Sequence, residues 1–315
     1  MSKPNCPKCN SFRELTLHLH ELSLFCRLLN DEKPVYKIIK RSVVESGSAK
    51  TTSIAKWLSL ASQLEQVTMN TFRYEEAHIY CEPVSDELNS DAQHYSSLAT
   101  SITRFIFISN ALEETYRLTS QAYEESYSTA SKQGKKIERQ RSYSTQAAWL
   151  LDEKFDAASL PKHYLHKVNA LLELASAYRD EFDASFDLDL LKSSRNSMGL
   201  AIVRNLRNHI AHATFPIIEN PEFNWDYDDP KVKKLILALL LRASRVATMN
   251  IQILLSSVCD TFKSDEYNYF SEDPDTGGKF KEIFSLKHLE NLHINQDFGL
   301  NESSYWAWRY DSLED

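Results

Sequence analysis

Glycine is scarce in this sequence, with only 6 residues among 315. Folds built from strands and tight turns depend on glycine, because it adopts backbone conformations that other residues avoid. The sequence also lacks internal repeats and any convincing alternation of apolar and polar residues. Apolar residues instead recur at spacings of three and four, which is the period of a helix. We therefore predict an all-α fold with a helical bundle at its centre.

The usual marks of a secreted or membrane protein are missing as well. The first residues, Met-Ser-Lys-Pro-Asn-Cys, contain no apolar segment of the kind found in signal peptides. The apolar run at residues 235–241 is too short to span a bilayer. The five cysteines are an odd number and form no pattern typical of secreted disulfide-bonded domains. We expect a cytoplasmic protein with no membrane contact.

Breaks in the helical pattern divide the chain into three parts. Residues 1–85 are expected to form a helical N-terminal region that serves as a regulatory or dimerisation segment. Within it, residues 31–34 interrupt the helical pattern. Residues 90–262 are expected to form the bundle, with one long helix at about 92–131 and an apolar helix at 231–261. The polar stretch 86–91 is the predicted boundary, and residues 263–315 form a C-terminal extension.

Acidic residues are absent from residues 190–218, although the whole chain has a formal net charge of -8. That charge argues against a general nucleic-acid coat protein but leaves room for a local basic site. If residues 200–212 form a helix, its apolar residues make one buried stripe. The polar side chains then share the remaining surface, namely Arg204, Asn205, Arg207, Asn208, His209 and His212.

This set of side chains suits RNA cleavage without a metal. Arginine binds phosphate through a two-pronged, permanently charged group, and histidine exchanges a proton near neutral pH. An imidazole can therefore take the proton of a ribose 2′-OH or protonate the leaving 5′ oxygen, while an arginine stabilises the phosphate. The alternative is a solvated helix face whose histidines interact with the helix dipole.

Arg207-Asn208-His209-Ile210-Ala211-His212 resembles the R-N-x-x-x-H signature of the HEPN superfamily. Those proteins are helical nucleases and nucleotide-binding proteins of prokaryotic toxin–antitoxin and phage-defence systems. The resemblance covers about residues 90–261. It implies a homodimer in which two motifs form one composite ribonuclease site, with Arg207 and His212 catalytic and Asn208 positioning them. It also implies an acidic residue on the first bundle helix, either Glu113 or Glu114.

A second, overlapping copy of the motif begins at Arg204 and Asn205. Arg207 and His212 are five residues apart, or about 140° around a regular helix, so they converge only if the helix is distorted or a partner subunit supplies one of them. Arg204 and His212 converge better on a regular helix. We rank Arg207 first and expect Arg204, Asn205 and His209 to contact RNA or phosphate.

A basic segment at residues 132–141 is a second candidate for RNA contact. Lys135, Lys136 and Arg139 carry its charge, and aromatic residues follow, as in surfaces that track a nucleic-acid backbone. The alternative is a solvated turn between helices.

Cys6 and Cys9 have the spacing of half a zinc site. The nearby His18, His20 and Cys26 form no matching second pair, so two free thiols are the alternative. His163 and His166, one helical turn apart, are a further metal candidate, although surface histidines are the default. We expect no cofactor and no metal, with Cys6 and Cys9 as the candidate ligands if one is bound.

Together these features predict a metal-independent endoribonuclease that cleaves RNA by 2′-OH attack. The resemblance suggests a bacterial toxin or anti-phage effector, with an antitoxin or another defence protein as partner. The alternative is a catalytically silent HEPN-like module that binds RNA or a nucleotide, or docks a partner.

Overall fold

A computed structural model describes residues 6–39, 42–135, 138–182, 196–222, 230–259 and 286–295. These residues are mostly helical, which confirms the predicted largely α fold. The prediction that the fold is all-α is wrong in one respect, because β1 (Glu32–Ile39) and β2 (Ser42–Lys50) form a two-stranded antiparallel sheet. The expected break at residues 31–34 therefore coincides with the start of a strand.

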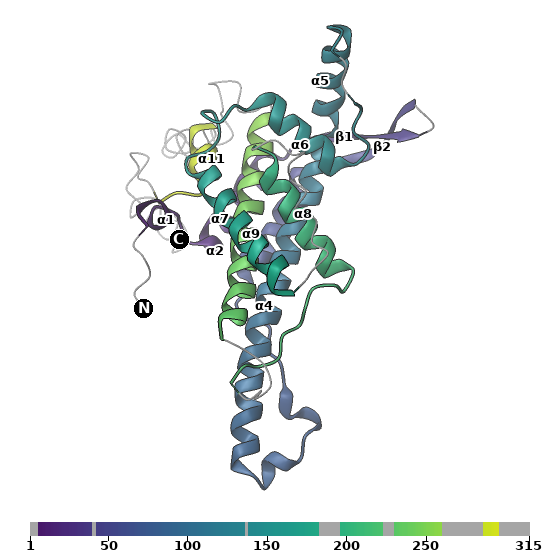
Figure 1. Ribbon diagram of the computed structural model, residues 1–315. Coiled ribbons are helices and arrows are strands. Elements are labelled where there is room, and N and C mark those ends of the chain that lie inside the picture. Colours follow the sequence, from purple (N-terminus) through teal and green to yellow (C-terminus); the bar gives the residue numbers. More distant parts are fainter. Residues whose placement is uncertain are drawn as a thin grey trace, which may run out of the picture.

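Helices account for most of the described chain (Figure 1). They are α1 (Pro7–Asn10), α2 (Leu15–Leu29), α3 (Thr51–Gln63), α4 (Glu82–Leu118), α5 (Ser120–Lys132), α6 (Tyr143–Lys154), α7 (Tyr164–Phe182), α8 (Met198–Ala211), α9 (Pro230–Val258) and α11 (Leu286–Asn291). Two short 3-10 helices, η1 (Thr71–Tyr74) and η2 (Ala77–Ile79), precede α4. Within the C-terminal extension, only residues 286–295 belong to the described part.

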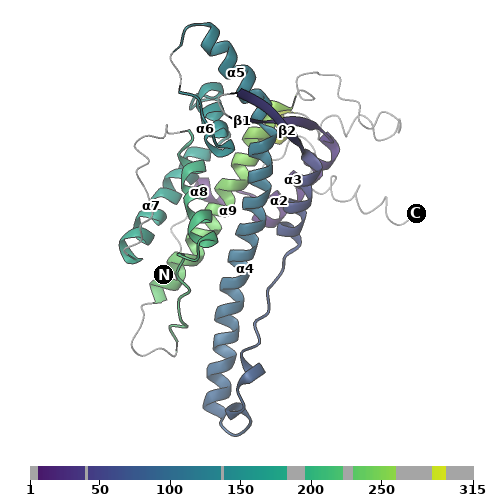
Figure 2. The same ribbon diagram turned by 90° about the vertical axis from the view of Figure 1, so that its right-hand side faces the viewer.

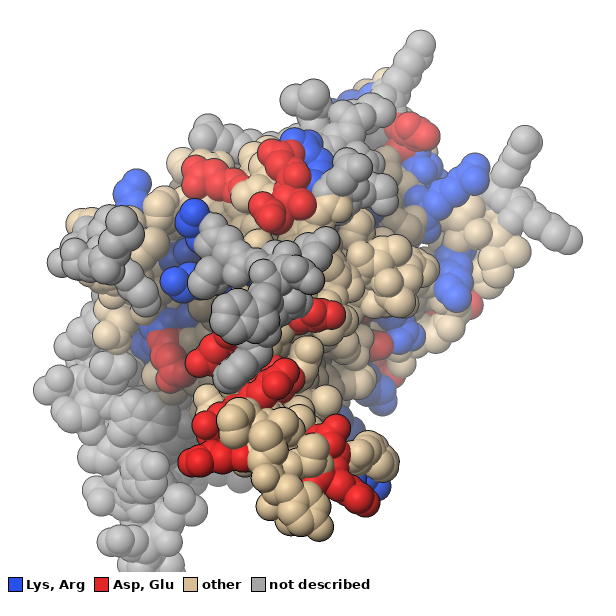
Figure 3. Space-filling model, turned by 60° about the horizontal axis from the view of Figure 1, so that its bottom comes forward, with Lys and Arg blue, Asp and Glu red and all other residues tan. Residues whose placement is uncertain are grey.

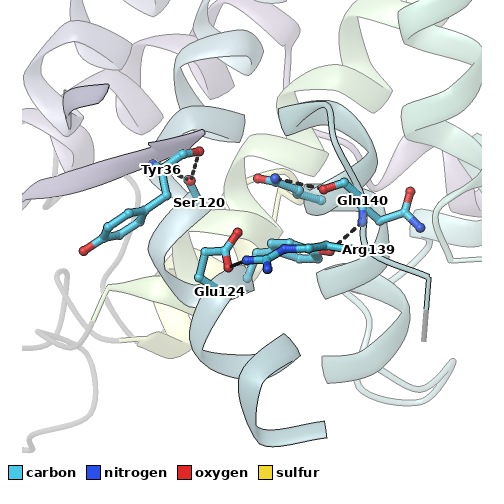
Figure 4. Close-up of polar contacts among 7 residues, drawn as sticks. Tyr36, Ser120, Glu124, Arg139 and Gln140 are labelled. Atoms are coloured by element: carbon cyan, nitrogen blue, oxygen red, sulfur yellow. Dashed lines mark hydrogen bonds and ion pairs between the residues drawn. The ribbon is translucent and has the colours of Figure 1, made fainter. Parts of the chain in front are cut away.

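The sequence did not predict the hairpin, because few residues of its two strands are buried. β2 is exposed except at Ala49, so its residues need not alternate between apolar and polar. Pro34 sits within β1, which a two-stranded sheet tolerates because each strand has one unpaired edge. The hairpin is attached to α5: the Tyr36 N–H donates to Ser120 Oγ at 2.9 Å, and that hydroxyl donates to the Tyr36 carbonyl at 3.2 Å (Figure 4).

The predicted boundary at residues 86–91 is wrong, because these residues lie inside helix α4. The core does not divide there either, because buried residues from α2, α3, α4, α7, α8 and α9 form one hydrophobic cluster. The single helix expected at 92–131 is instead α4 and α5, separated at Thr119. The Thr119 hydroxyl donates to the Tyr116 carbonyl at 2.8 Å at this junction.

Helices α4 and α9 run side by side through the centre of the molecule. In Figure 2, α7 and α8 lie on one side of this pair and α2 and α3 on the other. The apolar helix expected at 231–261 is confirmed as α9. It is long and apolar enough to cross a membrane, but 72% of its most apolar window is buried inside the protein, as in a core helix.

The first turns of α4 extend beyond the bundle together with η1 and η2 (Figure 1). Acidic side chains gather at this projecting end (Figure 3). The exposed acidic residues of these segments are Glu75, Glu76, Glu82, Asp86 and Glu87. Part of the negative charge of the chain is thus concentrated at one end of the molecule.

Candidate functional site

Helix α8 carries the motif residues and packs closely on its neighbours. Ile202, Val203 and Leu206 form its buried stripe, as predicted. At Gly199 the backbone approaches α7 and α9 so closely that a Cβ atom would lie 2.8 Å from Val246 Cγ1 and 2.9 Å from the Tyr164 hydroxyl. Glycine at the first turn of α8 therefore sets how deeply the helix sits in the bundle.

The helix remains regular through the motif. The His212 N–H donates to the Asn208 carbonyl at 2.9 Å, which is the normal helical bond. α8 ends at Ala211, His212 caps it, and Ala213 follows with a φ of 55°. A regular helix separates Arg207 and His212 by about 140°, so helix distortion does not bring them together. Arg207 is partly buried and His212 is exposed. The remaining routes to a shared site are a second copy of the chain or the register that begins at Arg204.

Glu113 on α4 faces the arginines of α8. Burial raises the pKa of the Glu113 carboxyl, while the positive charges of Arg207 and Arg204 oppose that rise. Glu114 instead pairs with Arg117 at 2.8 Å. Of the two acidic residues that the sequence left open, the structure therefore places Glu113 beside the motif.

Tyr116 belongs to the same cluster but was not anticipated from the sequence. Its side chain is buried, and burial raises the pKa of its hydroxyl well above the usual range, with Glu113 and the two arginines as charged neighbours. The hydroxyl has no hydrogen-bond partner among the described residues. Tyr116 lies three residues after Glu113, about one helical turn along α4. This spacing was the signal in the sequence that could have placed Tyr116 on the same helix face as Glu113.

The other polar residues of the motif divide into two groups. Arg207 Nη1 donates to Asn208 Oδ1 at 3.3 Å, so Asn208 orients the guanidinium. Asn205 is partly buried on the same helix. His209 instead packs edge-on against the Tyr178 ring, with centroids 6.2 Å apart. His209 is thus part of an aromatic cluster and is less available for RNA than expected.

A pocket of about 260 Å³ opens between α6 and α8. Arg204 lines it together with the Trp149 ring and the hydroxyl residues Ser144 and Thr145. Asp152, also in the lining, accepts a hydrogen bond from Ser197 Oγ at 2.9 Å. The pocket thus combines a cation, an aromatic ring and hydroxyl groups, which are the groups that bind a phosphate and stack a base.

The basic segment is neutralised in part by carboxylates. Lys135 Nζ lies 3.2 Å from Glu153 Oε1. Arg139 forms an ion pair with Glu124 (Figure 4) and lies 4.8 Å from the centre of the Tyr127 ring. Lys136 lies outside the described residues. These partners favour a structural role for Lys135 and Arg139, in which they connect the segment to α5 and α6.

Cys6 and Cys9 lie beside His166 on α7, and not beside the nearby residues considered from the sequence. Burial disfavours ionisation of the Cys9 thiol, but hydrogen bonds with His166, Cys6 and Lys167 and the charge of Lys167 outweigh it. Together they lower the pKa of Cys9 to about 6. His18 hydrogen-bonds to Gln252 instead, and Cys26 is buried in the core.

The chain matches no protein-family model, no curated protein and no solved structure. Its functional interpretation therefore rests on its own residues.

Proposed function

We propose that the protein is an endoribonuclease whose site is the polar face of α8, in line with the HEPN-like motif. The observation that carries the proposal is the grouping of charges at α8: Glu113 on the neighbouring helix lies near enough to Arg204 and Arg207 for both positive charges to act on its carboxyl. One carboxylate near two arginines does not cancel their combined positive charge. The resulting surface suits a phosphate group.

Cleavage would proceed by attack of the ribose 2′ oxygen on the adjacent phosphorus. His212 accepts the 2′-OH proton, the P–O5′ bond breaks, and the products are a 2′,3′-cyclic phosphate and a 5′-OH end. Arg207, oriented by Asn208, stabilises the charge that develops on the phosphate oxygens. DNA lacks the 2′-OH and is not a substrate for this reaction.

A homodimer completes the site in this proposal. Because Arg207 and His212 diverge on a regular helix, the Arg207 of one chain works with the His212 of a second copy. Two copies also supply two imidazoles, one to accept the 2′ proton and one to protonate the 5′ oxygen. The biological setting that fits the motif is a bacterial toxin or anti-phage effector in the cytoplasm, controlled by an antitoxin or another defence protein.

RNA would approach the polar face of α8, which has no acidic residue of its own, and avoid the acidic end of α4. No carboxylate occurs at residues 190–218, whereas exposed acidic side chains gather at the projecting end of the molecule (Figure 3). Like charges repel the RNA backbone there, so the charge distribution orients the substrate.

The test is an RNA cleavage assay in EDTA with the wild type, Arg207→Ala and His212→Ala. We expect the wild type to cut and each variant to lose about 10²–10⁴-fold in rate. Arg179→Ala is the matched control, because Arg179 is exposed at the end of α7 and pairs with Asp180. Product ends identify the reaction: a 3′-phosphate end without a cyclic intermediate, or activity that requires added metal, would rule out this mechanism.

A second candidate function is RNA or nucleotide binding without catalysis. The pocket between α6 and α8 favours it, because Arg204 and Trp149 line a space suited to a phosphate and a base. A wild type that binds RNA, loses affinity in Trp149→Ala and never cuts would support this function over cleavage.

A further inference from the structure

Three potential metal ligands meet at the N-terminal edge of the bundle. The Sγ atoms of Cys6 and Cys9 lie 3.7 Å and 3.5 Å from His166 Nε2, and all three ligand atoms lie within 4.8 Å of one another. Two thiols and an imidazole are the ligands that Zn²⁺ prefers. The three side chains therefore have the right chemistry for a zinc site.

The distances also fit zinc. Tetrahedral coordination with ordinary Zn–S and Zn–N bonds places a sulfur and a nitrogen ligand about 3.5 Å apart. Both observed sulfur–nitrogen separations are close to that value. The three ligand atoms are therefore already spaced as the ligands of one ion.

We propose that Cys6, Cys9 and His166 bind one Zn²⁺, with the fourth position open to water. The two thiolates balance the charge of the ion, so the centre is neutral when the imidazole is neutral. The proposal is independent of the proposed ribonuclease activity, and the ion has no part in RNA cleavage.

The ligands sit on segments that hold them in position. Cys6 and Cys9 bracket one turn, in which the Cys9 N–H donates to the Cys6 carbonyl at 2.9 Å. The residues that follow are fixed to the C-terminal segment by the bridge between Phe12 and Ile294. His166 lies in the first turns of the long helix α7, whose register is set by the core. The site therefore joins two parts of the chain that are distant in sequence.

A second layer of contacts supports the thiolates. Lys167 Nζ donates to Cys9 Sγ at 3.4 Å and lies 3.9 Å from the centre of the Phe12 ring. Hydrogen bonds from neighbouring groups to metal-bound thiolates orient them and reduce their reactivity. Lys167 thus has the role of an outer partner that fixes the Cys9 side chain.

The site would clamp the N-terminal segment to α7. Short segments such as the four residues of α1 are marginal alone, and a metal supplies the missing binding energy. Thiolates and an imidazole favour Zn²⁺ over Mg²⁺ or Ca²⁺, which prefer oxygen ligands. The two thiols could instead be oxidised to a disulfide, and the test below distinguishes metal binding from disulfide formation.

The test uses the full-length protein, purified in reductant without added metal. Elemental mass spectrometry is expected to find one zinc per chain. After chelation, Co²⁺ is the probe, because it shows intense visible d–d bands and thiolate charge transfer only in tetrahedral sites with sulfur ligands. We expect Cys6→Ser, Cys9→Ser and His166→Gln each to lose the zinc and the charge-transfer band.

The controls are Cys81→Ser, which changes an exposed thiol outside the cluster, and His163→Gln, whose ring packs on Phe12. Both are expected to retain zinc in full. Wild type without zinc that also fails to bind Co²⁺, or a Cys6–Cys9 disulfide formed in preference to metal uptake, overturns the proposal. Full zinc retention in Cys9→Ser or in His166→Gln overturns it too. The Co²⁺ spectrum of the wild type decides the matter even if a variant does not fold.

Discussion

The imidazole Nε2 of His166 lies 3.5 Å from the sulfur of Cys9, although 157 residues separate the two positions in the chain. This contact turns a two-residue thiol motif into a three-ligand cluster. It also connects the N-terminal segment to α7.

Removing the metal is expected to expose the N-terminal segment to proteases. Arg13 is buried, and its backbone N–H donates to the His293 carbonyl at 3.0 Å. If zinc clamps the preceding residues, chelation increases local opening there, so trypsin cuts after Arg13 faster. Mass spectrometry of timed digests measures the rate. Equal rates with and without chelator would contradict the clamp, and Cys9→Ser should digest at the fast rate in both conditions.

Glu113→Gln is expected to raise stability at neutral pH. Burial raises the pKa of Glu113, so the folded chain holds this proton to a higher pH than the unfolded chain does. The free energy of unfolding therefore falls as the pH rises and Glu113 loses its proton. Glutamine cannot ionise, so the variant does not lose this stability. Urea denaturation at pH 4 and pH 7 measures the difference, which should favour the variant more at pH 7.

Glu114→Gln is the matched control, because Glu114 forms a surface pair with Arg117 and should contribute no more than about 1 kcal/mol. A Glu113→Gln variant that is less stable than the wild type at pH 7 would mean that attraction to Arg204 and Arg207 outweighs burial. On the proposed function, the same substitution lowers RNA cleavage, because it removes the negative charge near Arg204 and Arg207.

Gly199→Ala is expected to destabilise the bundle by about 1–3 kcal/mol. The added methyl group would lie 2.8 Å from Val246 Cγ1 and 3.0 Å from Val168 Cγ2, and both side chains are branched and buried. α8 must then shift away from α7 and α9. The thermal midpoint Tm reports the loss, and an unchanged Tm would show that α8 packs more loosely than this geometry requires.

Stability is expected to fall as pH decreases from about 6.5 to 4, because two buried histidines are neutral in the fold. Arg245 Nη1 donates to His18 Nδ1 at 3.0 Å, so His18 Nε2 carries its proton and donates to Gln252 Oε1 at 2.9 Å. Gln252 Nε2 donates to His293 Nδ1 at 3.2 Å, and His293 Nε2 donates to the Lys162 carbonyl at 2.8 Å. A proton added to either imidazole would occupy the Nδ1 atom that accepts one of these hydrogen bonds.

Burial lowers the pKa of His293 to about 4 and the pKa of His18 well below its usual value. The unfolded chain thus binds protons that the folded chain does not, and each histidine costs up to about 1.4 kcal/mol per pH unit in that window. Urea denaturation between pH 7 and pH 4.5 measures the slope. His293→Gln should have a shallower slope, and an identical slope would exclude His293 as a source.

Arg204 and Lys135 are expected to differ in their contribution to RNA binding. Arg204 lines an open pocket, whereas Lys135 is paired with Glu153. Arg204→Ala should therefore weaken binding and reduce the slope of log affinity against log salt by about 0.7–0.9, the value of one phosphate contact. Lys135→Ala should leave that slope nearly unchanged. Fluorescence anisotropy with labelled RNA at several salt concentrations tests both, and equal effects would place RNA on the basic segment too.

Local patterns predicted the helices that carry the candidate site. The buried stripe of α8 follows from apolar residues at helical spacing, and the long apolar run of α9 follows from composition alone. The polar residues around Arg207 were also visible, because they fall on the opposite face of the same helix. Such features depend on neighbours within a few residues, so the sequence contains them directly.

Only the tertiary structure decided which distant side chains meet. The hairpin escaped prediction because its exposed strands have no buried face to impose alternation. The choice of Glu113 over Glu114 depends on how α4 rotates against α8, and His166 reaches the two cysteines only because α7 packs beside the N-terminal segment. Helix periodicity defines which face of each helix is buried. The contacts between faces depend on how the whole core packs, which no local spacing specifies.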